Sequence, residues 1–104
     1  MAKFFLSNRA VEDLSSIWNY TCEKWSERQA DLYYHLLINA FEKLVRNPGI
    51  GIKYFDIFPG LRGLKIGHHL VFYFVTEGRD VEIVRILHER MDVGGRMKEP
   101  LSRD

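Results

Sequence analysis

The sequence predicts an α+β fold, in which a helical hairpin packs on an antiparallel sheet of three to four strands in the order β-α-α-β-β-β. Two observations predict it. The front half carries two consecutive stretches with apolar side chains at helical spacing. The back half carries three short runs rich in Val, Ile, Phe and Tyr, separated by turn residues, as in a meander of antiparallel strands. Because an apolar helix stripe must be buried, we expect both helices to cover one face of the sheet.

Length and composition limit the possible classes of protein. A chain of 104 residues with 46% apolar and 28% charged residues has the composition of one ordinary globular domain. Its single cysteine, Cys22, excludes an internal disulfide and a cysteine-rich zinc site. No apolar run approaches the roughly 20 residues of a membrane helix, and the first apolar residues are too few for a signal peptide. We therefore expect a cytoplasmic protein without a membrane partner.

The charge balance argues against a nucleic-acid-binding surface. There are 15 Lys and Arg residues against 14 Asp and Glu residues, so the net charge is +1, and the two signs are mixed along the chain. Proteins that bind nucleic acids usually gather positive charge on one face, because phosphate contacts dominate their affinity. Composition thus favours a protein-binding function.

The first predicted strand, residues 3–7, leads directly into the first predicted helix. Ser7 or Asn8 is suited to cap that helix, and its first turn is expected to hold two carboxylates, Glu12 and Asp13, near the positive end of the helix dipole. The apolar stripe of this helix consists of Val11, Leu14, Ile17, Trp18, Cys22 and Trp25. Cys22 is therefore expected to be an inert core thiol.

A second helix starts almost at once, because residues 26–29 have the sequence of a capping box. Residues 47–49, Asn-Pro-Gly, end it. So short a link forces the two helices into an antiparallel hairpin. The apolar face of the second helix consists of Ala30, Tyr33, Leu37, Ala40, Phe41 and Leu44.

The rest of the chain is predicted to form a loop, three strands and a tail. Residues 48–60 form a loop that its aromatic side chains are expected to hold in place. The predicted strands are residues 61–66, 69–75 and 81–87, and Gly67 with His68 fits a type II′ turn between the first two. Residues 94–104 are expected to be a flexible C-terminal tail that follows a single domain of residues 1–93.

Three segments of the back half carry a family resemblance: residues 60–63 (Gly-Leu-Arg-Gly), 70–73 (Leu-Val-Phe-Tyr) and 85–92 (Arg-Ile-Leu-His-Glu-Arg-Met-Asp). Residues 9–14 and 44–48 add weaker support. In this order the chain resembles, over roughly residues 3–93, the RelE/ParE superfamily of bacterial toxins, and its ending looks more like the ParE branch. The resemblance implies the toxin of a type II toxin–antitoxin system, neutralised by a tight hetero-oligomeric complex with a cognate antitoxin.

The superfamily divides by chemistry. ParE-type members inhibit DNA gyrase, and so replication, without a known catalytic step of their own, whereas RelE-type members are ribosome-dependent mRNA endoribonucleases. The resemblance to ParE implies a gyrase-binding protein rather than an enzyme, with no cofactor and with DNA contact left to the antitoxin. A third interpretation is a domain that binds the antitoxin but lacks toxicity.

RNA cleavage would need a base, an acid and positive charge where the phosphorane forms. The candidates for these roles are Arg62, Lys65, Arg85 and His88. RelE-type enzymes place several basic residues together and often a Tyr near the end of the last strand. In this sequence Glu89 follows His88, and no Tyr follows Tyr73. We therefore expect no catalytic residues.

For gyrase binding, the candidate target-facing residues lie at the exit of the last strand: Arg85, His88, Arg90 and Asp92. Two of them have structural alternatives. A charge at Arg85 inside so apolar a strand must pair with an acid, reach solvent or be covered by a partner. His88 could instead anchor the strand end to a backbone carbonyl or to a carboxylate such as Glu89 or Asp92.

Metal binding is not expected. His68 and His69 are adjacent, and adjacent residues on a strand point to opposite faces, so they would not converge on one ion. No cysteine or histidine cluster completes a zinc site either.

Aromatic residues make up 13% of the chain, which is a large share for so small a core. Rings that remain exposed are favoured anchors of protein interfaces. The predicted antitoxin-binding residues are Trp18, Trp25, Tyr33 and Tyr34. They would seat an extended, amphipathic antitoxin segment, which could also add a strand to an open sheet edge. Full burial of these rings in the free protein would contradict this hypothesis.

Overall fold

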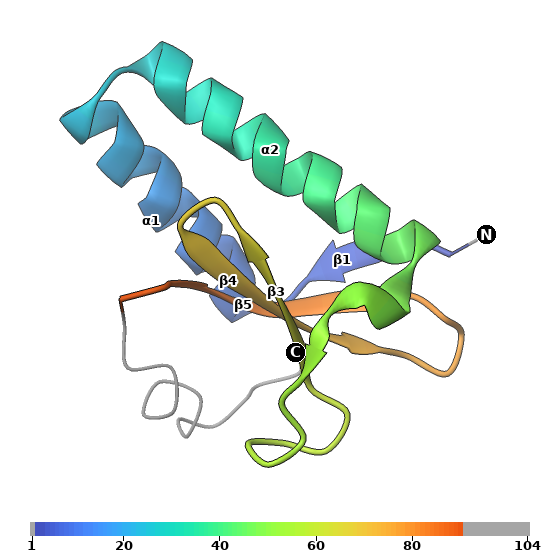
Figure 1. The fold of residues 1–104 in the computed structure, drawn as a ribbon. Helices are drawn as coiled ribbons and strands as arrows, with labels where there is room; N and C mark the ends of the chain where they lie inside the picture. Colours follow the sequence, from blue (N-terminus) through green and yellow to red (C-terminus); the bar gives the residue numbers. More distant parts are fainter. Residues whose placement is uncertain (1, 91–104) are drawn as a thin grey trace.

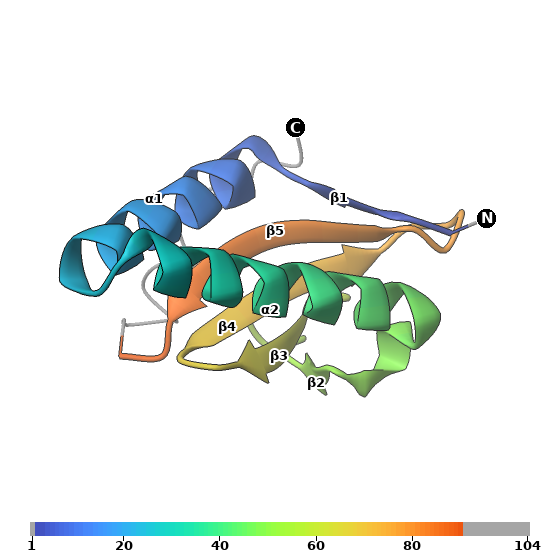
Figure 2. The same ribbon diagram turned by 90° about the horizontal axis from the view of Figure 1, so that it is seen from above.

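The structure, a computed structural model, describes residues 2–90. Two helices cover one face of a five-stranded sheet with the strand order β1-β5-β4-β3-β2 (Figures 1 and 2). The elements are β1 (Phe4–Leu6), α1 (Asn8–Lys24), α2 (Glu27–Arg46), the 3₁₀ turn η1 (Pro48–Ile50), β2 (Ile52–Lys53), β3 (Arg62–Ile66), β4 (His69–Val75) and β5 (Val81–His88). The predicted α+β class and the helical hairpin are confirmed.

The sheet has more strands than the sequence predicted. β3, β4 and β5 form the expected antiparallel meander, but β1 pairs with β5 in the parallel direction and β2 adds two residues to the far edge. β4 has neighbours on both sides, so the free edge of β5 is the place where β1 can pair. Backbone hydrogen bonds from Val81 to the Lys3 carbonyl and from Ser7 to the Ile83 carbonyl fix its direction.

Both helices begin at serine caps, as predicted. The Ser7 hydroxyl accepts a hydrogen bond from the Ala10 backbone N–H, and Ser26 accepts one from Gln29. The first turn of α1 holds no acidic residue, so the predicted place of Glu12 and Asp13 is wrong by about one turn. In the described part of the chain, no helix is long and apolar enough to cross a membrane.

The main core lies between the helices and the sheet. Its fully buried members come from α2 and the central strands, and include Leu37, Phe41, Leu44, Tyr73 and Ile83. α1 contributes fewer buried side chains than its sequence stripe suggests. Leu14 and Ile17 pack against the core, Val11 and Trp25 are exposed, and Cys22 is half-buried rather than in the core. The apolar stripe of α1 is therefore wider than the core requires.

The second face of the sheet is covered by the loop between β2 and β3. Tyr54 packs edge-on against Phe72, and Phe58 packs against Phe74 in the same way. The Tyr54 backbone also donates to the Leu61 carbonyl at 2.9 Å. These contacts confirm that aromatic side chains hold the loop in place.

Candidate partner-binding site

The interior of β5 carries a buried ion pair. Arg85 Nε donates to Asp13 Oδ2 at 2.8 Å and Arg85 Nη2 donates to Asp13 Oδ1 at 3.2 Å. The side chains are only 8% and 15% exposed. Asp13 Oδ2 also accepts the Ile86 backbone N–H at 2.9 Å, which closes this part of the free β5 edge. Of the interpretations of Arg85, the structure shows the pairing with an acid.

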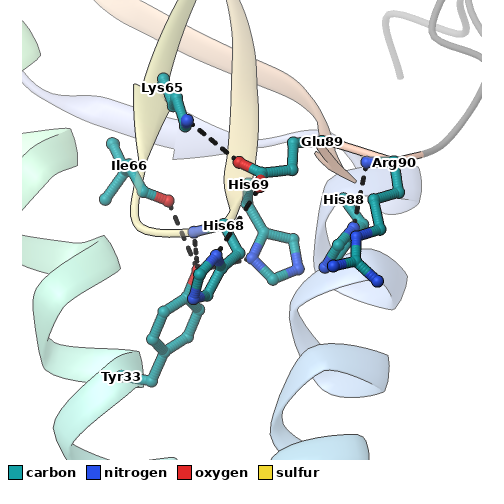
Figure 3. Close-up of polar contacts among 8 residues, drawn as sticks. All are labelled: Tyr33, Lys65, Ile66, His68, His69, His88, Glu89 and Arg90. Atoms are coloured by element: carbon teal, nitrogen blue, oxygen red, sulfur yellow. Dashed lines mark hydrogen bonds and ion pairs between the residues drawn. The ribbon is translucent and has the colours of Figure 1, made fainter.

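The end of β5 has a different environment, because it lies beside the β3–β4 turn. His88 is paired in register with His69, and the centroids of their rings are 5.2 Å apart. His68, in the turn, stacks on His88 with a centroid separation of 6.4 Å. Tyr33 rises from α2 toward the same turn, where its hydroxyl lies 2.5 Å from His69 Nδ1 and accepts the His68 backbone N–H at 3.1 Å (Figure 3).

This arrangement corrects the prediction that the adjacent histidines diverge. Gly67 has a φ of 58°, and His68 has a negative φ, since Arg79 is the only described non-glycine residue with a positive one. A type II′ turn of Gly67 and His68 requires this combination. His68 therefore belongs to the turn rather than to a strand, and its ring and that of His69 both lie near His88. Within residues 2–90, no group of three His, Cys, Asp or Glu side chains is placed to hold a metal ion.

The local charges are set by burial and by one carboxylate. Burial, together with the neighbouring His88 and His68, lowers the pKa of His69 to about 4, so the ring is neutral at pH 7. Burial also raises the pKa of Tyr33. A hydrogen bond from Lys65 lowers the pKa of Glu89, whose Oε2 lies 3.1 Å from Lys65 Nζ and whose Oε1 lies 3.8 Å from His68 Nδ1.

Tyr33 and the three histidines His68, His69 and His88 line an open groove of about 1010 Å³ between the helical hairpin and the ends of the strands. We call it the histidine groove. One wall is aromatic, since Trp25 is 76% exposed and Tyr20 is 60% exposed. The other wall and the floor hold polar groups. The residues that define it are Tyr20, Trp25, Tyr33, His69, His88 and Arg90.

A second groove, of about 530 Å³, lies between α1 and α2 on the other side of α1. We call it the helix groove. Its main apolar lining is Val11, Leu14, Trp18 and Tyr34, and Asp31 is its charged member. Val11 is 50% exposed and Tyr34 is 39% exposed, so apolar surface is open to solvent there.

The two grooves divide the predicted antitoxin-binding residues. Trp18 and Tyr34 line the helix groove, whereas Trp25 and Tyr33 line the histidine groove. None of the four is fully buried, which is the condition that the hypothesis required.

The four residues of the RNA-cleavage hypothesis do not meet at one point. Arg62 pairs in register with Tyr73 and Lys65 with Leu70, so they alternate to opposite faces of β3. Arg62 Nη1 donates to the Gly51 carbonyl at 3.0 Å, Lys65 pairs with Glu89, and Arg85 is buried. Of the target-facing candidates, His88 and Arg90 line the histidine groove and Arg85 lies in the interior. Asp92 and residues 94–104 lie outside the described residues.

Sequence reasoning missed three members of these sites. Asp13 was assigned to the first turn of the first helix rather than to the pair with Arg85, and nothing in the sequence relates residues 72 positions apart. Tyr20 was missed although it lies three residues after the core-packing Ile17, a spacing that places it at the edge of the α1 stripe. The contact between Tyr33 and His69 depends on the hairpin register and has no local signal.

Comparison with known proteins identifies the family. The family model described as the ParE toxin of the type II toxin–antitoxin system parDE matches residues 4–93. Toxin ParE1 of Mycobacterium tuberculosis is 39% identical over 92 residues, which cover 88% of this chain and 94% of the relative. Toxin ParE of Escherichia coli is 33% identical over 101 residues, which cover 97% of this chain and 98% of the relative.

A solved structure shares the fold. It is described as the chromosomal ParDE TA system from P. aeruginosa, and it superposes with a TM-score of 0.69 at 20% identity, covering 85% of this chain and 95% of that chain. The family model and the two relatives extend over nearly the whole domain that carries both grooves. The chain therefore belongs to the ParE toxin family and is the toxin component of a type II toxin–antitoxin system.

Proposed function

We propose that this toxin inhibits DNA gyrase, and so replication, and that its cognate antitoxin neutralises it by covering the exposed aromatic grooves. The observation that carries the proposal is the combination of two open aromatic grooves with four candidate catalytic side chains that are held apart. Such an arrangement supports binding rather than acid–base catalysis, which needs its groups within reach of one reacting centre. A cytoplasmic location, where gyrase works, is part of the proposal.

The helix groove is the surface proposed for the antitoxin. Its apolar side chains stand between two antiparallel helices and suit the apolar face of an amphipathic segment. Partly exposed Trp and Tyr side chains are the residue types that most often dominate interface energies. Trp18 from α1 and Tyr34 from α2, which both line the groove, are therefore the proposed anchors.

The end of β5 is the surface proposed for gyrase. His88 is half-buried and Arg90 is exposed, so both are accessible at the strand exit. Arg85 would act only through the fold, since its guanidinium is paired with Asp13 beneath this surface. Asp92, which lies outside the described residues, is a further proposed contact.

A gyrase supercoiling assay tests the proposal. Purified toxin is added to gyrase and relaxed plasmid, with and without antitoxin, and both supercoiled and cleaved DNA are measured. We expect inhibition with trapped cleaved DNA, reversed by stoichiometric antitoxin. Gyrase that is unaffected by a large excess of toxin would contradict the proposal. Cleavage of ribosome-bound mRNA would then indicate the RelE-type activity, and harmless overexpression would indicate a binding domain without toxicity.

Antitoxin binding to the helix groove has its own test. Trp18→Ala is expected to weaken the toxin–antitoxin complex at least about tenfold, as for the loss of an aromatic anchor. Leu36→Ala is the control, because Leu36 is 45% exposed on α2 and lines neither groove. Equal affinities of the two variants, measured by calorimetry, would remove Trp18 from the interface.

A further inference from the structure

The protons of the histidine groove can be assigned from its hydrogen bonds. The Tyr33 hydroxyl accepts the His68 backbone N–H, so its own proton is available to an acceptor. His69 Nδ1 lies 2.5 Å away, nearer than the Ile66 carbonyl at 3.4 Å. Tyr33 therefore donates to His69 Nδ1, and the neutral His69 ring carries its one proton on Nε2.

His88 has the same arrangement of ring nitrogens, with Nδ1 as acceptor and Nε2 as donor. Its Nδ1 accepts the Arg90 backbone N–H at 3.1 Å, so a neutral His88 also carries its proton on Nε2. The Arg90 guanidinium adds a permanent cation that lines the same groove. Among residues 2–90, no hydrogen-bond acceptor contacts either Nε2 atom, and no carboxylate pairs with the Arg90 side chain. The groove thus offers hydrogen-bond donors from three side chains: His69 Nε2, His88 Nε2 and the Arg90 guanidinium.

Negative charge is absent from the described lining of this groove. None of the described residues that line it is acidic. The nearest carboxylate in sequence, Glu89, is paired with Lys65 and lies 3.8 Å from Nδ1 of the groove residue His68 (Figure 3). Donors that no acid in the groove lining has already paired are suited to a carboxylate, and hydrogen bonds from Arg or imidazole to a carboxylate are among the stronger ones in proteins.

The helical side of the groove presents apolar surface. Trp25 and Tyr20 hold large exposed rings there, and Ile17, one turn before Tyr20 on α1, also lines the groove. A buried Trp or Tyr ring removes 150–250 Å² of surface from water, so an apolar partner side chain beside the carboxylate would add binding energy. The groove therefore matches a segment in which an acidic residue stands next to an aromatic or aliphatic one.

We propose that the histidine groove is a second antitoxin subsite, which binds an acidic residue of the antitoxin through His69 Nε2, His88 Nε2 and Arg90. The inference rests on the proposed function in assigning the antitoxin to the helix groove. The two grooves share α1, with Trp18 on one side and Tyr20 on the other, so an antitoxin chain leaving the helix groove can continue round the tip of the helical hairpin. The antitoxin would then cover His88 and Arg90 and block the proposed gyrase surface directly.

Charge reversal tests the subsite. Arg90→Glu is expected to weaken the complex with the purified cognate antitoxin at least tenfold in calorimetry at low salt. Arg79→Glu is the matched control, because Arg79 is an exposed arginine in the turn before β5, at the opposite end of the strand. It should change the affinity by less than twofold. Equal affinities of the two variants would overturn the proposal.

A second pair of variants tests the imidazole. His88→Phe keeps a ring but removes the Nε2 donor, and is expected to weaken antitoxin binding at least fivefold. His35→Phe is its control, since His35 is exposed on α2 and lines neither groove. Urea unfolding of both variants separates a lost donor from a lost fold. A folded His88→Phe variant with unchanged affinity would remove His88 from the subsite.

Rescue identifies the partner residue. Each Asp and Glu of the antitoxin is changed in turn to Lys and tested against the Arg90→Glu toxin. One substitution should restore affinity at least fivefold, and restoration by none of them would overturn the proposal.

The gyrase assay is independent of this measurement. Wild-type toxin that does not inhibit gyrase would remove the proposed function alone. Loss of gyrase inhibition by Arg90→Glu with unchanged antitoxin affinity would assign the groove to the target instead.

Discussion

β5 carries charged groups in two places, and the comparison between them separates fold from function. In the interior of the strand, Arg85 and Asp13 are 8% and 15% exposed and share two hydrogen bonds, and Asp13 accepts a third from the Ile86 backbone N–H. At the strand end, Lys65 and Glu89 form one contact at 3.1 Å with 63% and 32% exposure. Both are ion pairs of a basic and an acidic side chain, but they differ in how far water reaches them and so in how much they stabilise the fold.

The difference follows from solvation. Removing one partner of a buried pair leaves a charge without water or a counter-ion, which is strongly unfavourable. Removing one partner of an exposed pair leaves a charge that water solvates, so little stability is lost. The interior pair therefore fixes α1 against the sheet, whereas the groups at the strand end remain free to exchange their contacts for those of a partner.

The largest expected effect comes from breaking the interior pair. Asp13→Ala should lower the free energy of unfolding by about 3–5 kcal/mol, because Arg85 and the Ile86 N–H both lose their acceptor. Urea unfolding monitored by circular dichroism measures it. Asp13→Asn keeps an acceptor oxygen and should cost less. A loss below about 1 kcal/mol for Asp13→Ala would show that the pair does not stabilise the fold.

A smaller effect is expected at the turn that shapes the histidine groove. In Gly67→Ala the new Cβ would lie 2.7 Å from the Tyr33 hydroxyl, at a φ of 58° that disfavours side chains. We expect a loss of about 2–3 kcal/mol, together with displacement of Tyr33 from His69. Gly49→Ala is the control, since its Cβ would meet nothing within 4 Å and its φ is not in the positive region. Similar unfolding curves for the two variants would contradict the steric argument.

These two sites also show which parts of the structure the sequence could predict. Local signals were sufficient for the helices, because Ser7 and Ser26 cap them and the apolar periodicity of α2 matches its buried face. They were also sufficient for the β3–β4 turn, where Gly67 was predicted at the position that needs a positive φ. Both signals arise within a few residues of one another.

The partnerships that build the sites are long-range, and no local pattern encodes them. Asp13 finds Arg85 because the parallel pairing of β1 brings the start of α1 beside β5. His69 finds His88 through strand register, and it finds Tyr33 only when α2 lies over the hairpin. β1 was predicted as a strand, but its parallel pairing with β5 is long-range and was not predicted. β2 was missed, because its two residues carry no alternation to detect.

Acid should weaken the fold through the histidine at the strand end. Folding lowers the pKa of His69 from 6.5 to about 4, so the unfolded chain binds the proton first as the pH falls. The stability from this group is complete above pH 6.5 and is lost between pH 6.5 and 4. Because the ring is partly exposed, we expect a loss of about 1–2 kcal/mol rather than the full linkage value of about 3.

The measurement compares wild type with His69→Gln. Urea unfolding at pH 7 and at pH 4.5 gives the acid-induced loss of stability for each protein, and the difference between the two losses isolates the histidine. We expect the variant to lose less stability than the wild type in acid. The same loss in both proteins would show that His69 is protonated in the folded state as easily as in the unfolded one.

The smallest effect is expected from the exposed pair. Lys65→Met removes the partner of Glu89 but keeps a long side chain, so the free energy of unfolding should change little. The wild-type advantage should shrink further in 0.5 M salt, because screening weakens exposed ion pairs. Side-by-side urea titrations of Lys65→Met and Asp13→Ala at two salt concentrations test both halves of the comparison. If the Lys65 variant lost as much stability as the Asp13 variant, exposure would not be what distinguishes the end of β5 from its interior. A difference of several-fold would show that the strand end holds its charges loosely, as a surface that must release them to a partner requires.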